Sequence, residues 1–169
     1  MLLKELEERM KSGEQLEEIL KKEGWRDFED LTSSILSESG FLTIKNLRFS
    51  YNKRRYEIDI IALENPRIIV ADCKHWKAKY SKFSALKNAT LLHYNRCLYF
   101  SYKLAELSLI DFESWKEIII IPTLVTLYEE RIKEKNNVFI VPLFKITSFL
   151  EGLRSGLFDV LKNKSFKLS

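Results

Sequence analysis

Leucines alternate with charged residues at helical spacing at the start of the chain. This pattern predicts two short amphipathic helices, over about 2–10 and 13–23. Ser12 and Gln15 have the spacing of a capping box for the second of these helices. Gly24 is expected to end that helix in the left-handed conformation.

A third helix is predicted over about 27–38. Phe28, Leu31 and Ile35 recur at helical spacing there, so one face of the helix is apolar and is expected to be buried. Gly40 follows the last residue of this pattern and is expected to stop the helix.

Three apolar segments with strand character come next, separated by short polar turns. Asn52 and Lys53 make the first turn, and the Glu-Asn-Pro segment 64–66 makes the second. Short turns join neighbouring antiparallel strands, so the three segments are expected to form a meander. The predicted strands cover about 41–50, 55–63 and 67–74.

The second half of the chain is predicted to contain a long helix, two strands and a closing helix. The segment 118–121 consists of isoleucines and is apolar on both faces, which indicates a central strand covered by helices on both sides. The predicted fold is an α/β sandwich with a mixed central sheet flanked by helices, plus N-terminal helices. The later elements are a helix over about 84–107, strands over about 117–127 and 137–141, and a helix from about residue 147.

The composition is typical of a soluble globular protein. The chain has 169 residues, of which 46% are hydrophobic and 31% charged, and this length suffices for one full core. We expect a helical extension over 1–24 and the main domain over 25–169. The sequence has no apolar segment of about 18 residues and no signal-peptide core, so a cytoplasmic location is expected. Cys73 and Cys97 have apolar neighbours and are expected to be buried thiols.

Charge is unevenly distributed along the chain. The net charge is +4, residues 1–40 are rich in acids, and basic residues concentrate over 45–87, where they alternate with aromatic residues. Basic side chains beside aromatic ones suit nucleic-acid contact. They equally suit the salt-bridged surface of a heat-adapted protein, which the abundant Lys, Glu and Ile also indicate. The candidate DNA contacts are Lys53, Arg54, Arg55, Lys77, Lys79, Lys82 and Arg96.

Two acids and a lysine interrupt the apolar strands of the meander. Asp59 is the only acid in the apolar part of its strand, and Asp72 and Lys74 lie two positions apart on the next strand. Residues i and i+2 of a strand point to the same face, so Asp72 and Lys74 share one side of the sheet. The short turn between the strands lets Asp59 lie at a similar height. Such a group is costly in a buried sheet unless it binds something.

The combination of two acids with a lysine suits a divalent cation and a phosphate. Mg²⁺ or Mn²⁺ takes carboxylate oxygens, keeps several waters and bridges to substrate phosphates. A bound ion polarises a phosphoryl oxygen and lowers the pKa of a bound water, and Lys74 is placed to orient that water or to balance charge. The pattern indicates phosphodiester hydrolysis. An ordinary ion cluster at a strand end is the alternative interpretation of the same residues.

The order of these residues resembles the PD-(D/E)XK nuclease superfamily, which has the restriction-endonuclease-like fold. Within it, the chain is most similar to the Mrr-type and archaeal Holliday-junction-resolvase-like branches. The resemblance covers residues 25–77 well and extends loosely to residue 150. The matching segments are 28–31 (Phe-Glu-Asp-Leu), 40–41 (Gly-Phe), 58–62 (Ile-Asp-Ile-Ile-Ala) and 72–74 (Asp-Cys-Lys).

The resemblance implies a metal-dependent deoxyribonuclease that cuts DNA by attack of a metal-activated water. It implies Glu29, Asp59 and Asp72 as ligands of Mg²⁺ or Mn²⁺, and Lys74 as the catalytic lysine. For Glu29 there is a second interpretation, because a glutamate in the first turn of a helix is favoured by the helix dipole alone.

Two positions depart from the superfamily pattern. Ile58 stands where the superfamily's name has Pro, and the downstream Gln of many members is missing. His93 and Arg96 lie on the long predicted helix where such a residue would come. A lone helical histidine is expected to pack or cap rather than to catalyse.

Two classes of function fit these residues: a DNA endonuclease, and a non-cleaving DNA-binding or assembly module with the same fold. Retention of both acids favours the enzyme, because a carboxylate pair that repels phosphate has no use in a pure binder. The residues do not distinguish duplex, branched and single-stranded DNA. A homodimer is compatible with cutting two strands.

Overall fold

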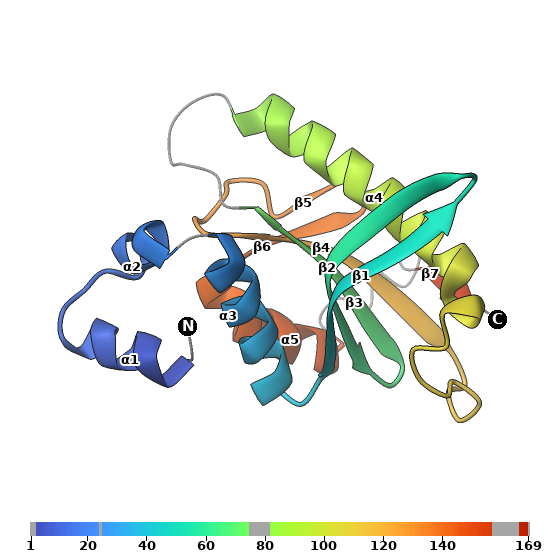
Figure 1. Cartoon of the computed structure of the whole chain (residues 1–169), viewed down its shortest axis with the longest axis horizontal. Coiled ribbons are helices and arrows are strands. Elements are labelled where there is room, and N and C mark those ends of the chain that lie inside the picture. Colours follow the sequence, from blue (N-terminus) through green and yellow to red (C-terminus); the bar gives the residue numbers. More distant parts are fainter. Residues whose placement is uncertain (1–2, 24, 75–81, 157–165, 169) are drawn as a thin grey trace.

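The computed structural model describes residues 3–23, 25–74, 82–156 and 166–168, and its centre is a seven-stranded mixed sheet (Figure 1). The strand order is β1-β2-β3-β4-β6-β5, and β7 pairs with β4 outside this path. The first three strands are antiparallel, whereas β3–β4 and β4–β6 are parallel. The strands are β1 (Leu42–Tyr51), β2 (Arg54–Glu64), β3 (Arg67–Lys74), β4 (Ile118–Thr126), β5 (Glu134–Lys135), β6 (Val138–Pro142) and β7 (Phe166–Leu168).

Helices cover both faces of this sheet, which confirms the predicted α/β sandwich. Side chains of α3 and α5 share one core cluster, and those of α4 belong to the cluster on the opposite face. β4 is central, because Ile120 belongs to the second cluster and Ile121 to the first. None of the described helices is long and apolar enough to cross a membrane. The helices are α1 (Leu3–Lys11), α2 (Leu16–Glu23), α3 (Trp25–Glu38), α4 (Lys82–Leu107), α5 (Ile146–Arg154) and a 3-10 turn, η1 (Leu143–Lys145).

The two N-terminal helices pack against α3 (Figure 1). Leu6 of α1 and Ile19 and Leu20 of α2 are buried in the same cluster as Phe28 of α3. Burial of these side chains against α3 stabilises the short helices, which are too short to persist alone in water. The boundary near residue 24 between an extension and the main domain stays a prediction.

The ends of the helices show where local sequence rules hold. Gly40 has φ +96°, and the N–H of Phe41 donates to the carbonyl of Leu36 at 3.1 Å. This is the Schellman geometry expected of a glycine after a helix. The predicted capping box is wrong: the hydroxyl of Ser12 donates to the carbonyl of Arg9 at 2.7 Å and so bonds the end of α1. The prediction for Gly24 lies outside the described residues.

Two strands, β5 and β7, were not predicted. They have two and three residues, too few for the alternation of apolar and polar residues to be recognised. The other elements agree with their predicted ranges to within a few residues, because their apolar repeats are long.

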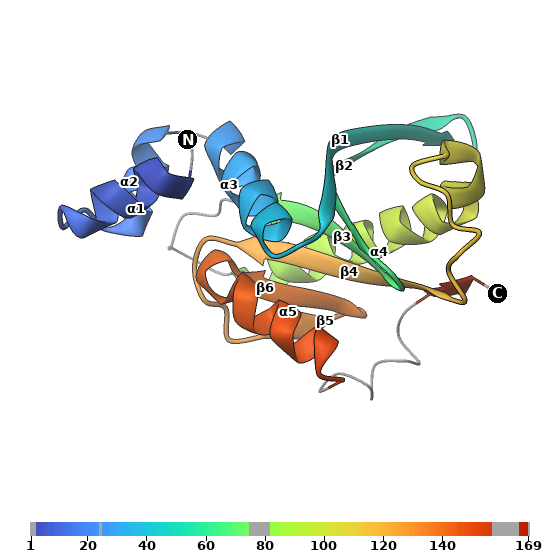
Figure 2. The ribbon, with the colours of Figure 1, turned by 90° about the horizontal axis from the view of Figure 1, so that it is seen from below.

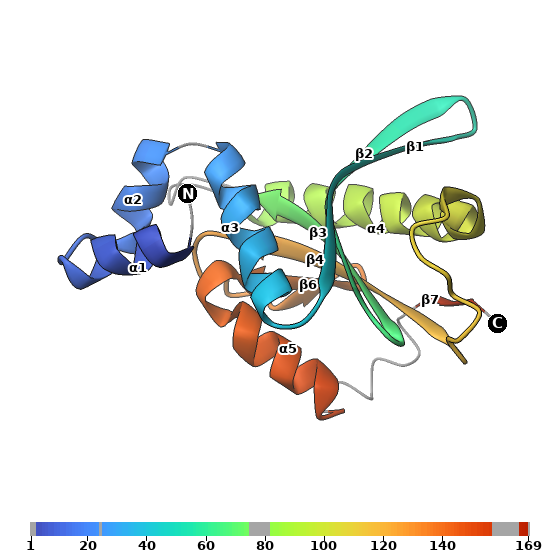
Figure 3. The same cartoon turned by 60° about the horizontal axis from the view of Figure 1, so that its bottom comes forward.

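The β1–β2 hairpin extends far beyond the rest of the sheet (Figures 2 and 3). β1 pairs with β2 from Leu42 to Tyr51, whereas β2 pairs with β3 only over 60–64. The outer part of the hairpin, residues 47–58, is therefore paired only with itself, and we call it the arm. Asn52 and Lys53 form its tip with φ values of +48° and +64°, which is the geometry of the tight turn predicted there.

Burial in the α4 cluster predicts a large difference between two phenylalanines. Phe100 is fully buried, whereas Phe144 is 56% exposed. Phe100→Ala is expected to lower the free energy of unfolding by about 3–5 kcal/mol, because it leaves a cavity in the core. The control Phe144→Ala is expected to change it by less than about 0.5 kcal/mol. Urea unfolding measures both; equal losses would contradict the described core.

Candidate active site

The site begins where β2 separates from β3. The ladder between these strands starts at the Ile60–Ala71 pair, and Asp59 is the residue just before it on β2. The backbone N–H of Cys73 donates to Oδ2 of Asp59 at 2.8 Å. The carboxylate thus satisfies a donor that the departing strand no longer pairs, because a buried N–H without a partner is costly.

Asp72 is buried and held by two cations. Nζ of Lys74 lies 2.7 Å from Oδ2, and Nη1 of Arg96 lies 2.7 Å from Oδ1. The side chain of Asp72 is only 5% exposed, and those of Lys74 and Arg96 are 29% and 24% exposed. The structure therefore brings Asp72 and Lys74 together on one face of β3, as their spacing predicted, and adds Arg96 from α4.

Glu29 reaches the site from α3, on the other side of the sheet. It lies between the fully buried residues Phe28 and Leu31 and is itself half-buried. Its negative charge raises the pKa values of both Asp59 and Cys73, so its carboxylate acts on the same point of the sheet. Glu29, Asp59, Asp72 and Lys74 therefore form one electrostatic group drawn from α3, β2 and β3.

The two aspartates have opposite pKa shifts. Burial, followed by the charge of Asp72, raises the pKa of Asp59 to about 6, against the lowering effect of the Cys73 N–H. Burial also acts to raise the pKa of Asp72, but the electrostatic effects of His93, Lys74 and Arg96, together with the hydrogen bond from Lys74, outweigh it and lower that pKa below its usual value. Asp72 is thus compensated by cations, whereas the negative charge on Asp59 is not.

His93 is a buried, neutral neighbour of the site. Its Nε2 lies 2.9 Å from the carbonyl of Val70, an acceptor that requires the proton on Nε2, and burial lowers the pKa of His93 to about 4. Its Nδ1 is buried and has no hydrogen-bond partner among the residues that the structure describes. This geometry agrees with the packing role expected for a lone helical histidine.

The described candidate DNA contacts lie in two separate places. Lys53, Arg54 and Arg55 are exposed at the tip of the arm. Arg96 pairs with Asp72, a contact that the sequence analysis did not assign. The signal for it is that Arg96 lies three residues after His93 and four before Phe100 on α4, so it borders the helix face that these two buried side chains define. Lys77, Lys79 and the side chain of Lys82 lie outside the described residues.

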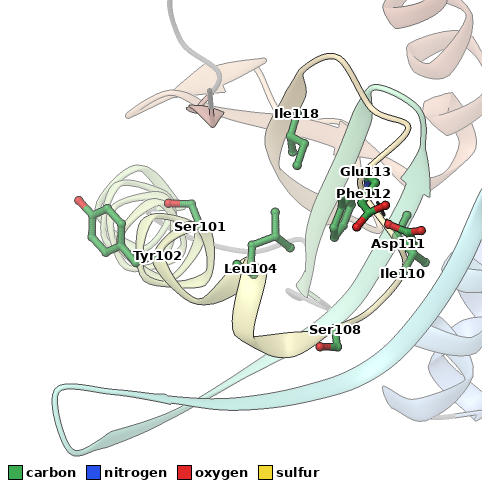
Figure 4. Close-up of a pocket in the computed structure, with 10 residues that line it drawn as sticks. Ser101, Tyr102, Leu104, Ser108, Ile110, Asp111, Phe112, Glu113 and Ile118 are labelled. Carbon is green, nitrogen blue, oxygen red and sulfur yellow. Dashed lines mark hydrogen bonds between the residues drawn. The ribbon is translucent and has the colours of Figure 1, made fainter.

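Two pockets lie away from these carboxylates. One, of about 780 Å³, is formed by the end of α4 and the following loop, with Tyr102, Leu104, Phe112 and Ile118 among its lining residues (Figure 4). The other, of about 420 Å³, lies between α3 and β1 and is lined by Ser33, Ser37 and Lys45 among others. None of Glu29, Asp59, Asp72 and Lys74 lines either pocket.

The donor chemistry of the site fits Mg²⁺ or Mn²⁺. In the described part of the chain, no group of three or more His, Cys, Asp or Glu side chains is placed to hold a metal ion by itself. These ions do not need one, since they bind to one or two carboxylates and complete their coordination with water and phosphate. The pKa of Asp59 is raised partly by two other carboxylates, and a cation would relieve that repulsion. Asp59 with Asp72 or Glu29 therefore supplies suitable hard oxygen ligands.

Comparison with known families agrees with this geometry. The sequence model of the nuclease-related domain (NERD) family matches residues 13–121. The chain therefore belongs to this family, which has the PD-(D/E)XK-like nuclease fold. The resemblance stated from the sequence is confirmed at the level of that fold.

Two further comparisons add little. No curated protein matches the chain. The crystal structure of a protein of unknown function, AF1548, matches with 17% sequence identity and a TM-score of 0.39. The match covers 73% of this chain and 54% of that one, so the chain spans about half of its length.

Ionisation of Asp59 is expected to destabilise the metal-free protein. Its pKa rises from 3.8 to about 6 on folding, so the folded state holds the proton more tightly and loses stability as pH rises from about 4 to above 6. This change in pKa corresponds to a loss of about 3 kcal/mol in the free energy of unfolding, and partial exposure of Asp59 reduces the loss to about 2 kcal/mol. In EDTA, Asp59→Asn should be about 2 kcal/mol more stable than the wild type at pH 8 and equally stable below pH 4.

Urea unfolding across this pH range measures the difference. Glu7→Gln, at an exposed position of α1, is the control for removing a carboxylate. A difference between the wild type and Asp59→Asn that stays constant from pH 4 to pH 8 would contradict the burial and repulsion described for Asp59.

Proposed function

We propose that the protein is a Mg²⁺- or Mn²⁺-dependent DNA endonuclease. The observation that supports this most directly is the incompletely compensated carboxylate of Asp59, whose pKa is raised to about 6 beside Asp72. It occurs in a chain of the nuclease-related domain family. The resemblance of residues 25–77 to Mrr-type and resolvase-like nucleases supports DNA as the substrate.

Each charged group has a role in this proposal. Asp59 would hold the cation, with Asp72 and Glu29 as the further candidate ligands, and the bound cation would supply a Lewis acid and an activated water. Lys74 stays beside Asp72 and faces the reacting phosphate, where its charge stabilises the negative charge that develops in the transition state. The N–H of Cys73 orients the carboxylate of Asp59 through its hydrogen bond of 2.8 Å. Arg96 fixes Asp72 from the side of α4.

Cleavage is expected to depend on the cation and on these side chains. The wild type should cut at least one DNA in a panel of duplex, fork, flap, junction and single-stranded substrates with Mg²⁺ or Mn²⁺, and should cut none in EDTA. Asp59→Asn and Lys74→Ala should each lower the rate by about 100-fold or more, because each removes a group that acts on the transition state. Gel analysis of labelled DNA measures the rates.

Lys11→Ala, at an exposed position of α1, is the matched lysine control and should cut at the wild-type rate. Undiminished cutting by both Asp59→Asn and Lys74→Ala would eliminate the assignment of this site. A folded wild type that binds DNA but cuts none of the panel would support the alternative, a non-cleaving DNA-binding module.

Metal affinity provides a test that does not need the right substrate. Asp59→Asn is expected to weaken Mn²⁺ binding by about tenfold or more in isothermal titration calorimetry, because it removes a charged ligand. Asp30→Asn is the matched Asp-to-Asn control, since Asp30 lies on α3 next to Glu29 but pairs with Lys45 at 2.5 Å. Equal affinities of the wild type and Asp59→Asn would count against Asp59 as a ligand.

A further inference from the structure

The arm carries a concentrated positive charge at its tip. Lys53, Arg54 and Arg55 are consecutive and exposed, and no carboxylate pairs with them among the residues that the structure describes. Nearer the sheet, by contrast, Arg48 is paired with Glu57 at 2.8 Å. The three tip cations are therefore available to an external anion.

Aromatic side chains brace the arm against α4, so its tip has a defined position. The rings of Tyr51 and Tyr99 stack with centroids 4.8 Å apart, and Tyr56 lies 5.2 Å from Tyr99. Phe49 meets Phe100 edge-on at 6.2 Å. Such aromatic pairs stabilise the contact beyond the burial of the rings alone. The hairpin is thus a braced projection rather than a loose loop.

The tip lies at a fixed spacing from Asp59 because it directly precedes β2, the strand that carries Asp59. Arg55 precedes Asp59 by four residues and Lys53 precedes it by six. At about 3.3 Å per strand residue, these separations are about 13 Å and 20 Å. One strand of a DNA duplex advances about 3.4 Å per base pair. A duplex lying along the arm would therefore place these cations about four to six base pairs from a phosphate at Asp59.

The geometry points to the arm as a duplex clamp: Lys53, Arg54 and Arg55 bind backbone phosphates of a DNA duplex about four to six base pairs from the scissile phosphate. This inference rests on the proposed function and specifies its substrate, which must carry a duplex flank of at least that length on one side of the cut. A regular duplex suits a rigid arm, because its phosphates are already at a fixed spacing.

The test compares DNA binding by two charge-reversal variants of the full chain. One is the tip variant, K53E with R54E and R55E. The control variant is K4E with K11E and R131E, which reverses three exposed cations on α1 and in the loop before β5. Binding of each to an uncut DNA hairpin with a 12-base-pair flank is measured by fluorescence anisotropy in EDTA, over a range of salt concentrations.

The tip variant is expected to bind at least about tenfold more weakly than the wild type near 0.1 M salt, with a log–log salt slope smaller by about three, one for each lost phosphate contact. The control variant should bind within about twofold of the wild type. On a hairpin with a flank of three base pairs, the wild type and the tip variant should bind equally. Matched circular-dichroism melting curves establish that both variants fold.

Three outcomes would overturn the clamp. The first is equal affinity of the wild type and the tip variant for DNA with the long flank. The second is an equal loss of affinity in the tip variant and the control variant. The third is that the tip variant loses as much affinity for single-stranded DNA of the same length as for the duplex. Because binding is measured without cleavage, a failure of the proposed nuclease function appears separately, as a wild type that binds the long flank but cuts no DNA with Mg²⁺ or Mn²⁺.

Discussion

The divergence of β2 from β3 is the constraint on which the rest of the site depends. Where the two strands part, the N–H of Cys73 needs an acceptor, and Asp59 provides it at 2.8 Å. That hydrogen bond keeps the carboxylate at a largely buried point close to Asp72. Burial and the charge of Asp72 raise the pKa of Asp59 to about 6. The same divergence releases the outer hairpin as a projecting arm. One local departure from regular pairing thus produces both the charged site and the extended surface beside it.

The site is electrostatically unbalanced in a specific way. Glu29, Asp59 and Asp72 contribute three carboxylates, while Lys74 and Arg96 contribute two cations, both of them on Asp72. The ionised form of Asp72 is stabilised by its two cationic partners, whereas the ionised form of Asp59 is destabilised by burial and by the nearby carboxylates. The imbalance therefore falls on Asp59. A divalent cation would remove it, which is why the proposed function depends on Asp59 more than on the better-held Asp72.

The sequence was sufficient for elements with a long periodic pattern and for residues related by strand geometry. Helices α3 and α4 and the meander follow from apolar repeats, and Asp72 with Lys74 follows from their i, i+2 spacing. Contacts between distant elements were not predictable in this way. Arg96 meets Asp72 only because α4 packs across β3, and Ser12 bonds Arg9 rather than starting α2 because the turn between the helices is longer than a capping box allows. The contact of Arg96 depends on tertiary packing, which local rules do not contain. The contact of Ser12 is local, but it is one of two local hydrogen bonds open to that side chain.

The reactivity of the two cysteines depends on local opening of the structure on each side of the sheet. Cys73 lies between Asp72 and Lys74 on β3, and Cys97 follows Arg96 on α4, so one thiol lies on each side of the sheet at the level of the site. Both thiols are fully buried, and burial raises both pKa values well above the ordinary value for cysteine. A thiol in this state does not react until the structure around it opens. The rate at which each cysteine becomes reactive therefore records how often the corresponding layer opens, on the α3 side for Cys73 and on the α4 side for Cys97.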